Sequence, residues 1–203
     1  ITQEFPEHQF AWKVLGAALK QMGKINESLV ASQKSVQLEP QDAEAHNNLG
    51  ILLKEQGRLK EAETSHRQAI TLKPDFAEAH NNLGILLKEQ DRLKEAEASY
   101  TQAITLKPDF AQAHNNLGNI LKKQGKLDDA EISYRQAIIL KSELTEAHSN
   151  LGNILKKQGK LDDAKISFRQ AIALKPDFAE AHNNLGNTLK EQGRLKEAEA
   201  SYR

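Results

Sequence analysis

The chain has 203 residues, and its 28 Lys and Arg residues balance 28 Asp and Glu residues, so the formal net charge is zero. This balance excludes the basic surface that non-specific nucleic-acid binding requires, and 5 % aromatic residues supply no stacking platform for single-stranded bases. The chain has no cysteine, which excludes disulfides and cysteine metal sites, and no apolar run approaches the roughly 18 residues of a membrane span, so no membrane insertion is predicted.

A unit of 34 residues recurs along almost the whole chain. Such a period is typical of solenoids, in which each repeat packs mainly against its neighbours and no central core is needed. We therefore predict the tail of a preceding repeat at residues 1–8 and repeats at 9–42, 43–76, 77–110, 111–144, 145–178 and 179–203. The last repeat is expected to be truncated in its second helix, so we expect the chain to be a fragment.

The residue pattern of each repeat predicts two antiparallel helices joined by a tight turn. In residues 43–76, apolar and small side chains at positions 45, 49, 52 and 53 mark one face of a first helix. Gly57 follows, where a left-handed residue would end that helix, and Asp91 holds this place in the next repeat. The second helix begins near Leu59 and ends at Lys73-Pro74, because the residue before proline disfavours helical backbone.

Two local features of the repeat carry structural predictions. Asp75 and Glu78 have the spacing of a capping box, so we expect Asp75 to be the N-cap of the next helix. Asp109 and Asp177 are expected to repeat this device. A glycine lies inside each first helix, as at Gly50, at a cost of about 1 kcal/mol against alanine. Its recurrence predicts a close approach of the partner helix, with Ala62 as the facing residue.

The repeats resemble the tetratricopeptide family. The family pattern is fullest at Trp12, Leu15 and Gly16, and later repeats keep the Leu-Gly pair, the alanine of the second helix and the final proline. The resemblance covers essentially the whole chain. It implies an all-α, right-handed superhelical solenoid of antiparallel helix pairs, with a concave face lined by the first helices.

Three rows of side chains are expected on that concave face. The best functional candidates are the asparagines Asn48, Asn82, Asn116, Asn150 and Asn184. A row of lysines contains Lys20, Lys54, Lys88, Lys122, Lys156 and Lys190. A third row changes from Ala17, Ile51 and Ile85 to Asn119, Asn153 and Asn187, so the face is predicted to be apolar early and polar late. Helical spacing also places Glu44 and Asn47 on this surface.

The asparagine row suggests recognition of peptide backbone. An asparagine side chain has an acceptor and two N–H donors, so it can pair with both groups of one peptide unit. First helices about 10 Å apart and an extended ligand rising about 3.3 Å per residue would let five asparagines span about 12 ligand residues. The alternative is that asparagine here is only a common helix-surface residue of the family. The lysines also allow two interpretations, and a solvated face is favoured over a site for an anionic partner.

Histidines also recur at the repeat spacing, but equivalent atoms about 10 Å apart cannot share one metal ion, whose ligands lie about 2 Å away. We therefore predict no metal site and no cofactor. His66 occupies a place held elsewhere by Tyr100, Tyr134, Phe168 and Tyr202. It is predicted to fill the core.

The function predicted from these features is a protein–protein interaction scaffold that binds extended peptide segments, without catalytic activity in this segment. One alternative is a substrate-recruiting domain of a larger glycosyltransferase or sulfotransferase. The repeats resemble the superhelical domain of O-GlcNAc transferase, and similar repeats occur in bacterial proteins that carry such enzymes. A second alternative is a self-assembly module that stacks end to end. Composition does not fix the compartment, and a cytoplasmic location is favoured.

Overall fold

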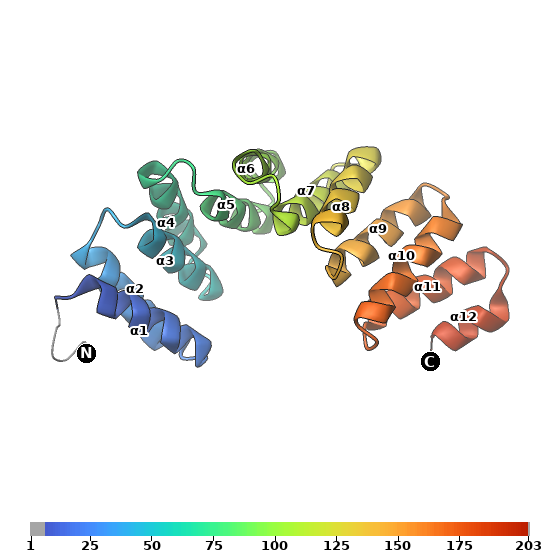
Figure 1. Ribbon diagram of the computed structural model, residues 1–203, viewed down its shortest axis with the longest axis horizontal. Coiled ribbons are helices and arrows are strands. Elements are labelled where there is room, and N and C mark those ends of the chain that lie inside the picture. The colour runs from blue at the N-terminus through green and yellow to red at the C-terminus, as the bar shows by residue number, and fades with distance from the viewer. Residues whose placement is uncertain (1–6, 203) are drawn as a thin grey trace. The chain divides into compact units, whose positions relative to one another are not determined.

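The computed structural model describes residues 7–202, and every regular element in that range is an α-helix. The first three helix pairs are α1 (Gln9–Gln21) with α2 (Ile25–Leu38), α3 (Ala43–Glu55) with α4 (Leu59–Leu72), and α5 (Ala77–Glu89) with α6 (Leu93–Leu106). The next three are α7 (Ala111–Lys123) with α8 (Leu127–Leu140), α9 (Thr145–Lys157) with α10 (Leu161–Leu174), and α11 (Ala179–Glu191) with α12 (Leu195–Ser201). Figure 1 shows these consecutive pairs, which confirm the predicted all-α class. The predicted repeat tail at residues 1–8 lies mostly outside the described residues.

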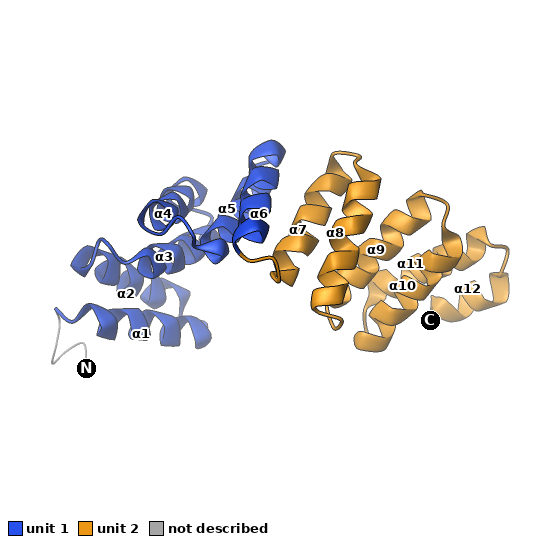
Figure 2. Ribbon diagram, turned by 45° about the horizontal axis from the view of Figure 1, so that its top comes forward, with its two compact units in different colours: residues 1–106 blue, residues 107–203 orange. Residues whose placement is uncertain are grey.

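The chain divides into two compact units, residues 1–106 and residues 107–203 (Figure 2). Each unit is a stack of three helix pairs. In unit 1, α2 packs against α3 and α4 packs against α5; in unit 2, α8 packs against α9 and α10 against α11. First helices also touch directly, as α3 does with α5 and α9 with both α7 and α11. Each unit therefore aligns its first helices on one face.

The tight turns within the pairs follow the prediction. The second residue after each first helix adopts left-handed backbone, with φ of +72° at Gly57 and +58° at Asp91. Glycine avoids the steric cost of this conformation, and aspartate is among the few other residues that tolerate it. The turn at Asp91 thus keeps the geometry of the others without a glycine.

A ring from the second helix packs against the glycine of the first helix in each pair from α3 and α4 onward. A Cβ atom built on Gly50 would lie 2.7 Å from the His66 ring, and one on Gly118 would lie 2.7 Å from the Tyr134 ring. The prediction of a close approach at these glycines is therefore correct. The prediction that Ala62 faces Gly50 is wrong: Ala62 is fully buried, but His66 supplies the atoms nearest to the glycine.

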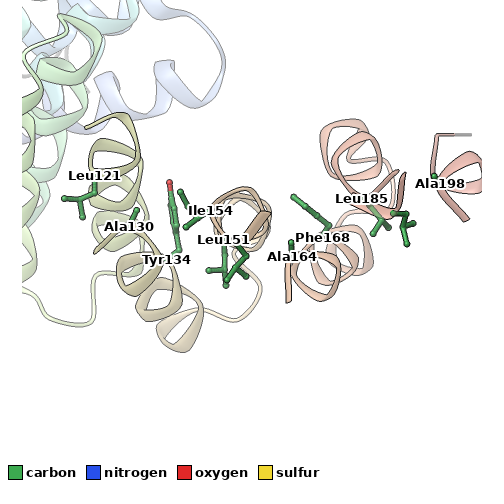
Figure 3. Packing of buried hydrophobic residues seen from close by; sticks show 11 residues of the cluster. Leu121, Ala130, Tyr134, Leu151, Ile154, Ala164, Phe168, Leu185 and Ala198 are labelled. Atoms are coloured by element: carbon green, nitrogen blue, oxygen red, sulfur yellow. The ribbon is translucent and has the colours of Figure 1, made fainter. Parts of the chain in front are cut away.

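The same rings form the centre of the core. Figure 3 shows the buried cluster of unit 2, in which Tyr134 and Phe168 have no exposed surface. Its other members are Leu121, Ala130, Leu151, Ile154, Leu155, Ala164, Leu185, Leu189 and Ala198. Because the cluster draws on successive pairs, the pairs bury a continuous core that no single pair could form.

The predicted capping boxes are wrong in register. The N-cap residues of α5, α7 and α11 are Phe76, Phe110 and Phe178, one position after the expected aspartates, and their side chains make no capping bond. The backbone explains the shift, since the amides of residues 79 and 80 bond to the carbonyl of Phe76 rather than to that of Asp75. In α3 the residue at this register is Asp42, whose carboxylate accepts a bond from the Ala45 amide.

The recurring histidines of the first helices secure the turns between pairs. Nε2 of His46 lies 2.9 Å from the Pro40 carbonyl oxygen, and the same bond recurs at His80, His114, His148 and His182. At His148 the carbonyl belongs to Ser142, so the contact does not require the proline. These histidines therefore donate to backbone, and within residues 7–202 no cluster of metal-ligating side chains occurs. Nor does that range hold a helix long and apolar enough to cross a bilayer.

The glycine–ring contact leads to a stability prediction. We expect Gly118→Ala to lower the free energy of unfolding by about 1–2 kcal/mol, because overpacking against the buried Tyr134 ring outweighs the gain of about 1 kcal/mol in helix propensity. Urea denaturation of the chain measures the change. Gly16→Ala is the matched control, since the nearest atom there is the small, rotatable Oγ of Ser32. We expect it to be neutral or stabilising, and equal losses in both variants would contradict the role of the ring.

Candidate peptide-binding face

The predicted asparagine row lies on the aligned first helices, but its members are not equivalent. Asn48 on α3 is exposed, Asn82, Asn150 and Asn184 are half-buried, and Asn116 is only 7 % exposed. In unit 2 the row occupies α7, α9 and α11, where α9 contacts both neighbours. The structure thus brings Asn116, Asn150 and Asn184 onto three consecutive helices.

These asparagines also join the helix pairs. Nδ2 of Asn82 donates to Oδ1 of Asn47 on the preceding first helix at 3.0 Å, and Nδ2 of Asn150 donates to Oδ1 of Asn115 at 3.2 Å. Each such bond uses one of the two N–H donors of the amide. Part of the row's function is therefore structural.

The expectation that Asn47 shares the open face is wrong. Asn47 is only 6 % exposed, and the corresponding Asn81, Asn115 and Ser149 are also buried. Its Oδ1 accepts from Asn82 and from Nδ1 of His66 at 3.1 Å. Burial, and to a smaller extent the Lys54 ammonium, lowers the pKa of His66 to about 4, so the ring is neutral near pH 7. A core side chain is thus connected through Asn47 to the asparagine row.

The hydrogen-bond partner of each third-row asparagine depends on the second-helix ring of the same pair. In α7, Asn119 Oδ1 accepts a 2.9 Å bond from the hydroxyl of the buried Tyr134. Asn187 accepts the same bond from Tyr202. Asn153 lies in the pair whose ring is Phe168, which has no hydroxyl, and its Oδ1 accepts from Asn184 instead. Sequence reasoning missed this coupling, although the Asn and Tyr occur 15 residues apart in both cases.

In unit 1 the third row is apolar, so a second-helix tyrosine there has no third-row asparagine as an acceptor. Ile85 stands where Asn119 and Asn187 accept a tyrosine hydroxyl, yet the ring of the same pair is Tyr100. The Tyr100 side chain is fully buried, and its hydroxyl has no hydrogen-bond partner within the described chain. Burial, together with the charge of Glu89, raises the pKa of Tyr100 well above its usual value. The hydroxyl therefore stays protonated and buried without an acceptor.

The lysine row is mostly paired with carboxylates of the next first helix. Lys20 reaches Glu55 at 3.0 Å, Lys54 reaches Glu89 at 3.1 Å, and Lys156 reaches Glu191 at 3.0 Å. Such surface ion pairs contribute about 0–1 kcal/mol, so a ligand can displace them at little cost. The remaining predicted lysine of unit 1, Lys88, is half-buried on α5.

Lys122 differs because a lysine, Lys157, holds the place of the glutamate. Nζ of Lys122 donates to Oδ1 of Asn150 at 3.3 Å. Burial and then the charge of Lys157 lower the pKa of Lys122, against a smaller opposing effect of Glu180. This part of unit 2 therefore combines a row asparagine with two close ammonium groups.

Two cavities open on the first-helix face of unit 1, each with a volume of about 210 Å³. One lies between α3 and α5 and is lined by Ile51, Lys54, Glu55, His66, Asn82 and Ile85. The other lies between α1, α2 and α3, where Ala17, Ser32 and Ile51 contribute to its wall. The part of the face that was predicted to be apolar therefore also contains cavities.

Comparisons with known proteins agree with this architecture. A family model described as "TPR repeat" matches residues 16–57, 52–91, 86–125, 118–159 and 152–193. The solved structure of PilF from Pseudomonas aeruginosa superposes with a TM-score of 0.87 at 22 % identity, covering 96 % of this chain and 88 % of that one. PilW, a type IV pilus biogenesis factor, gives 0.85 at 21 % identity, covering 95 % and 90 %. YrrB gives 0.68 at 20 % identity, covering 89 % and 93 %. No curated protein sequence matches the chain.

The two buried tyrosines should respond oppositely to loss of the hydroxyl. We expect Tyr134→Phe to destabilise by about 1 kcal/mol, because its bond to Asn119 is lost, and Tyr100→Phe to stabilise by a similar amount, because an unpaired buried hydroxyl is removed. Urea denaturation of both variants tests the prediction. Ile85→Asn is the control, since it offers Tyr100 an acceptor and should remove the benefit of Tyr100→Phe. Equal effects at the two positions would show that the hydroxyl environments do not differ.

Proposed function

The chain belongs to the tetratricopeptide-repeat family, and on that premise we propose that it holds extended peptide segments against its first-helix faces through the asparagine row. As an array of this family it is a protein–protein interaction scaffold. The asparagine-mediated capture of peptide backbone is the specific proposal. The observation that carries it is that Asn82, Asn150 and Asn184 each use only one amide N–H to bond to the preceding pair.

The spacing of the row suits an extended ligand. In unit 2, the half-buried Asn150 and Asn184 lie on neighbouring first helices, so with axes about 10 Å apart they span about 10 Å. An extended peptide rises about 3.3 Å per residue, so about three ligand residues fit along this distance. Each net hydrogen bond contributes about 1 kcal/mol, which gives modest affinity that neighbouring side chains adjust.

The rows beside the asparagines supply the selectivity. Unit 1 offers apolar walls at Ile51 and Ile85, which favour apolar ligand side chains. Unit 2 offers asparagines in their place and the ammonium groups of Lys122 and Lys157, which favour polar or acidic ones. Peptide binding also occurs in a protein of similar fold, since YrrB is "a TPR protein with an unusual peptide-binding site".

Two alternative functions are also proposed. A peptide-binding array of this kind can recruit substrates for a glycosyltransferase or sulfotransferase in a longer protein, and the flanking sequence of the parent protein would decide this. Self-assembly has its own supporting observation, because large apolar side chains are exposed on both the first and the last pair. They include Phe10, Val14, Met22, Val30 and Leu195. Light scattering over a concentration series tests it, and a monomer at all concentrations would rule it out.

The peptide proposal is tested with a random peptide array and a variant that carries Asn48→Ala, Asn82→Ala and Asn184→Ala. We expect at least tenfold weaker binding of the peptides that the unaltered chain selects, since each lost hydrogen bond is worth about 1 kcal/mol. Circular dichroism and urea denaturation check that the variant is folded, because Asn82 and Asn184 also bond to the preceding pair.

The matched control removes amides from another surface. Gln102→Ala and Gln170→Ala alter exposed amides on the second helices α6 and α10, and we expect unchanged peptide binding. If the asparagine variant binds the same peptides as tightly as the control does, the row does not hold ligand and the proposal is wrong.

A further inference from the structure

The first helix pair lacks the ring that every later pair places against its glycine. His66, Tyr100, Tyr134, Phe168 and Tyr202 each lie against the glycine of their own first helix. At the corresponding position of α2 the residue is Ser32. Gly16 is nevertheless present on α1, and its nearest neighbour is the small Oγ of Ser32. The backbone arrangement that receives a ring is thus retained without the ring.

The missing ring leaves a cavity of about 210 Å³ between α1, α2 and α3, lined in part by Gly16, Ala17, Ser32, Ile51 and Leu52. An apolar cavity of about 150 Å³ in another protein is large enough to bind benzene. The cavity of the first pair is therefore large enough for the ring of one aromatic side chain. The cavity beside His66 has a similar volume, but neither Gly50 nor Leu86 lines it, whereas the cavity of the first pair reaches inward to Gly16 and Leu52.

The polar groups in the wall are largely satisfied within the chain. The Ser28 hydroxyl donates to the Gly16 carbonyl oxygen at 2.7 Å, and the Ser35 hydroxyl accepts from Nε2 of Gln9 at 3.0 Å. At the rim, Lys20 is paired with Glu55. An incoming apolar ring therefore does not have to break the bonds of the two inner serines, and its desolvation cost stays small.

The cavity opens toward the first-helix face. Ala17 and Asn48 line it and are exposed, so the mouth lies beside a member of the asparagine row. A peptide whose backbone is held by Asn48 would direct a side chain into it. Ala17 stands where Asn119 accepts the hydroxyl of Tyr134, so the wall offers no such acceptor to a tyrosine hydroxyl.

We propose that this cavity is a receptor for one phenylalanine side chain of an extended peptide, which completes the first helix pair as the internal rings complete the others. The inference rests on the proposed peptide-binding function and adds an aromatic requirement at one place along the ligand. Burying a phenyl ring contributes enough free energy to raise affinity about 10- to 100-fold over alanine at that place.

The test uses fluorescein-labelled host peptides of sequence Ser-Gly-Ser-Gly-Xaa-Gly-Ser-Gly-Ser, with Phe, Tyr or Ala at Xaa, titrated into the chain. We expect the Phe peptide to bind about 10- to 100-fold more tightly than the Ala peptide, with Tyr between them. Ser32→Phe places a ring in the cavity from within the chain. It should abolish the preference for Phe, so that the Phe and Ala peptides bind equally, and raise the melting temperature.

Gln33→Phe is the matched control, because it adds the same ring at an exposed position of the same helix and should leave the preference intact. The aromatic receptor is overturned if the unaltered chain shows no preference for Phe, or if the preference survives Ser32→Phe. Neither result contradicts the binding of peptide backbone by the asparagine row. If no host peptide binds, peptide capture itself fails, and the cavity is tested alone by nuclear magnetic resonance titration with toluene. Toluene binding that Ser32→Phe removes supports the receptor, and the absence of toluene binding overturns it.

Discussion

The contact between a first-helix glycine and a second-helix ring sets the geometry on which the rest of the molecule depends. At Gly50, Gly84, Gly118 and Gly152 a single added carbon would lie within 2.6–2.7 Å of the ring. The two helices of a pair can therefore approach closely only while the glycine is retained. The same rings, with the small residues around them, form the buried core. A helix-interior glycine, unfavourable by about 1 kcal/mol in isolation, is thus offset by the packing that it permits.

From this contact, hydrogen bonds extend to the face where a ligand would bind. The Tyr134 hydroxyl reaches Asn119, and His66 reaches Asn47, which in turn accepts from Asn82. The side chains on the face are thus held by groups in the core, which restricts their rotamers before any ligand arrives. Such preorganisation reduces the ordering cost of binding. It also means that a residue on the face affects the core, because Ile85 leaves the buried Tyr100 hydroxyl without an acceptor.

The same helix pair presents different chemistry in different places because these positions vary while the backbone does not. Unit 1 has apolar third-row residues, whereas unit 2 has asparagines in this row and the lysines Lys122 and Lys157. In the first pair Ser32 stands in place of a ring, and the cavity there reaches inward to Gly16 and Leu52. A scaffold of this kind presents different surface chemistry without a change of fold.

The sequence alone determined the helices, their pairing and the left-handed turns at Gly57 and Asp91, because these depend on interactions between residues close along the chain. The 3.6-residue periodicity also identified the face that carries the asparagine row. Only the tertiary structure decided which groups meet across helices. It placed Asn47 in the interior, set His66 rather than Ala62 against Gly50, and moved the N-cap from Asp75 to Phe76. Those outcomes depend on distances of a few ångströms between neighbouring helices, and helical periodicity does not contain that information.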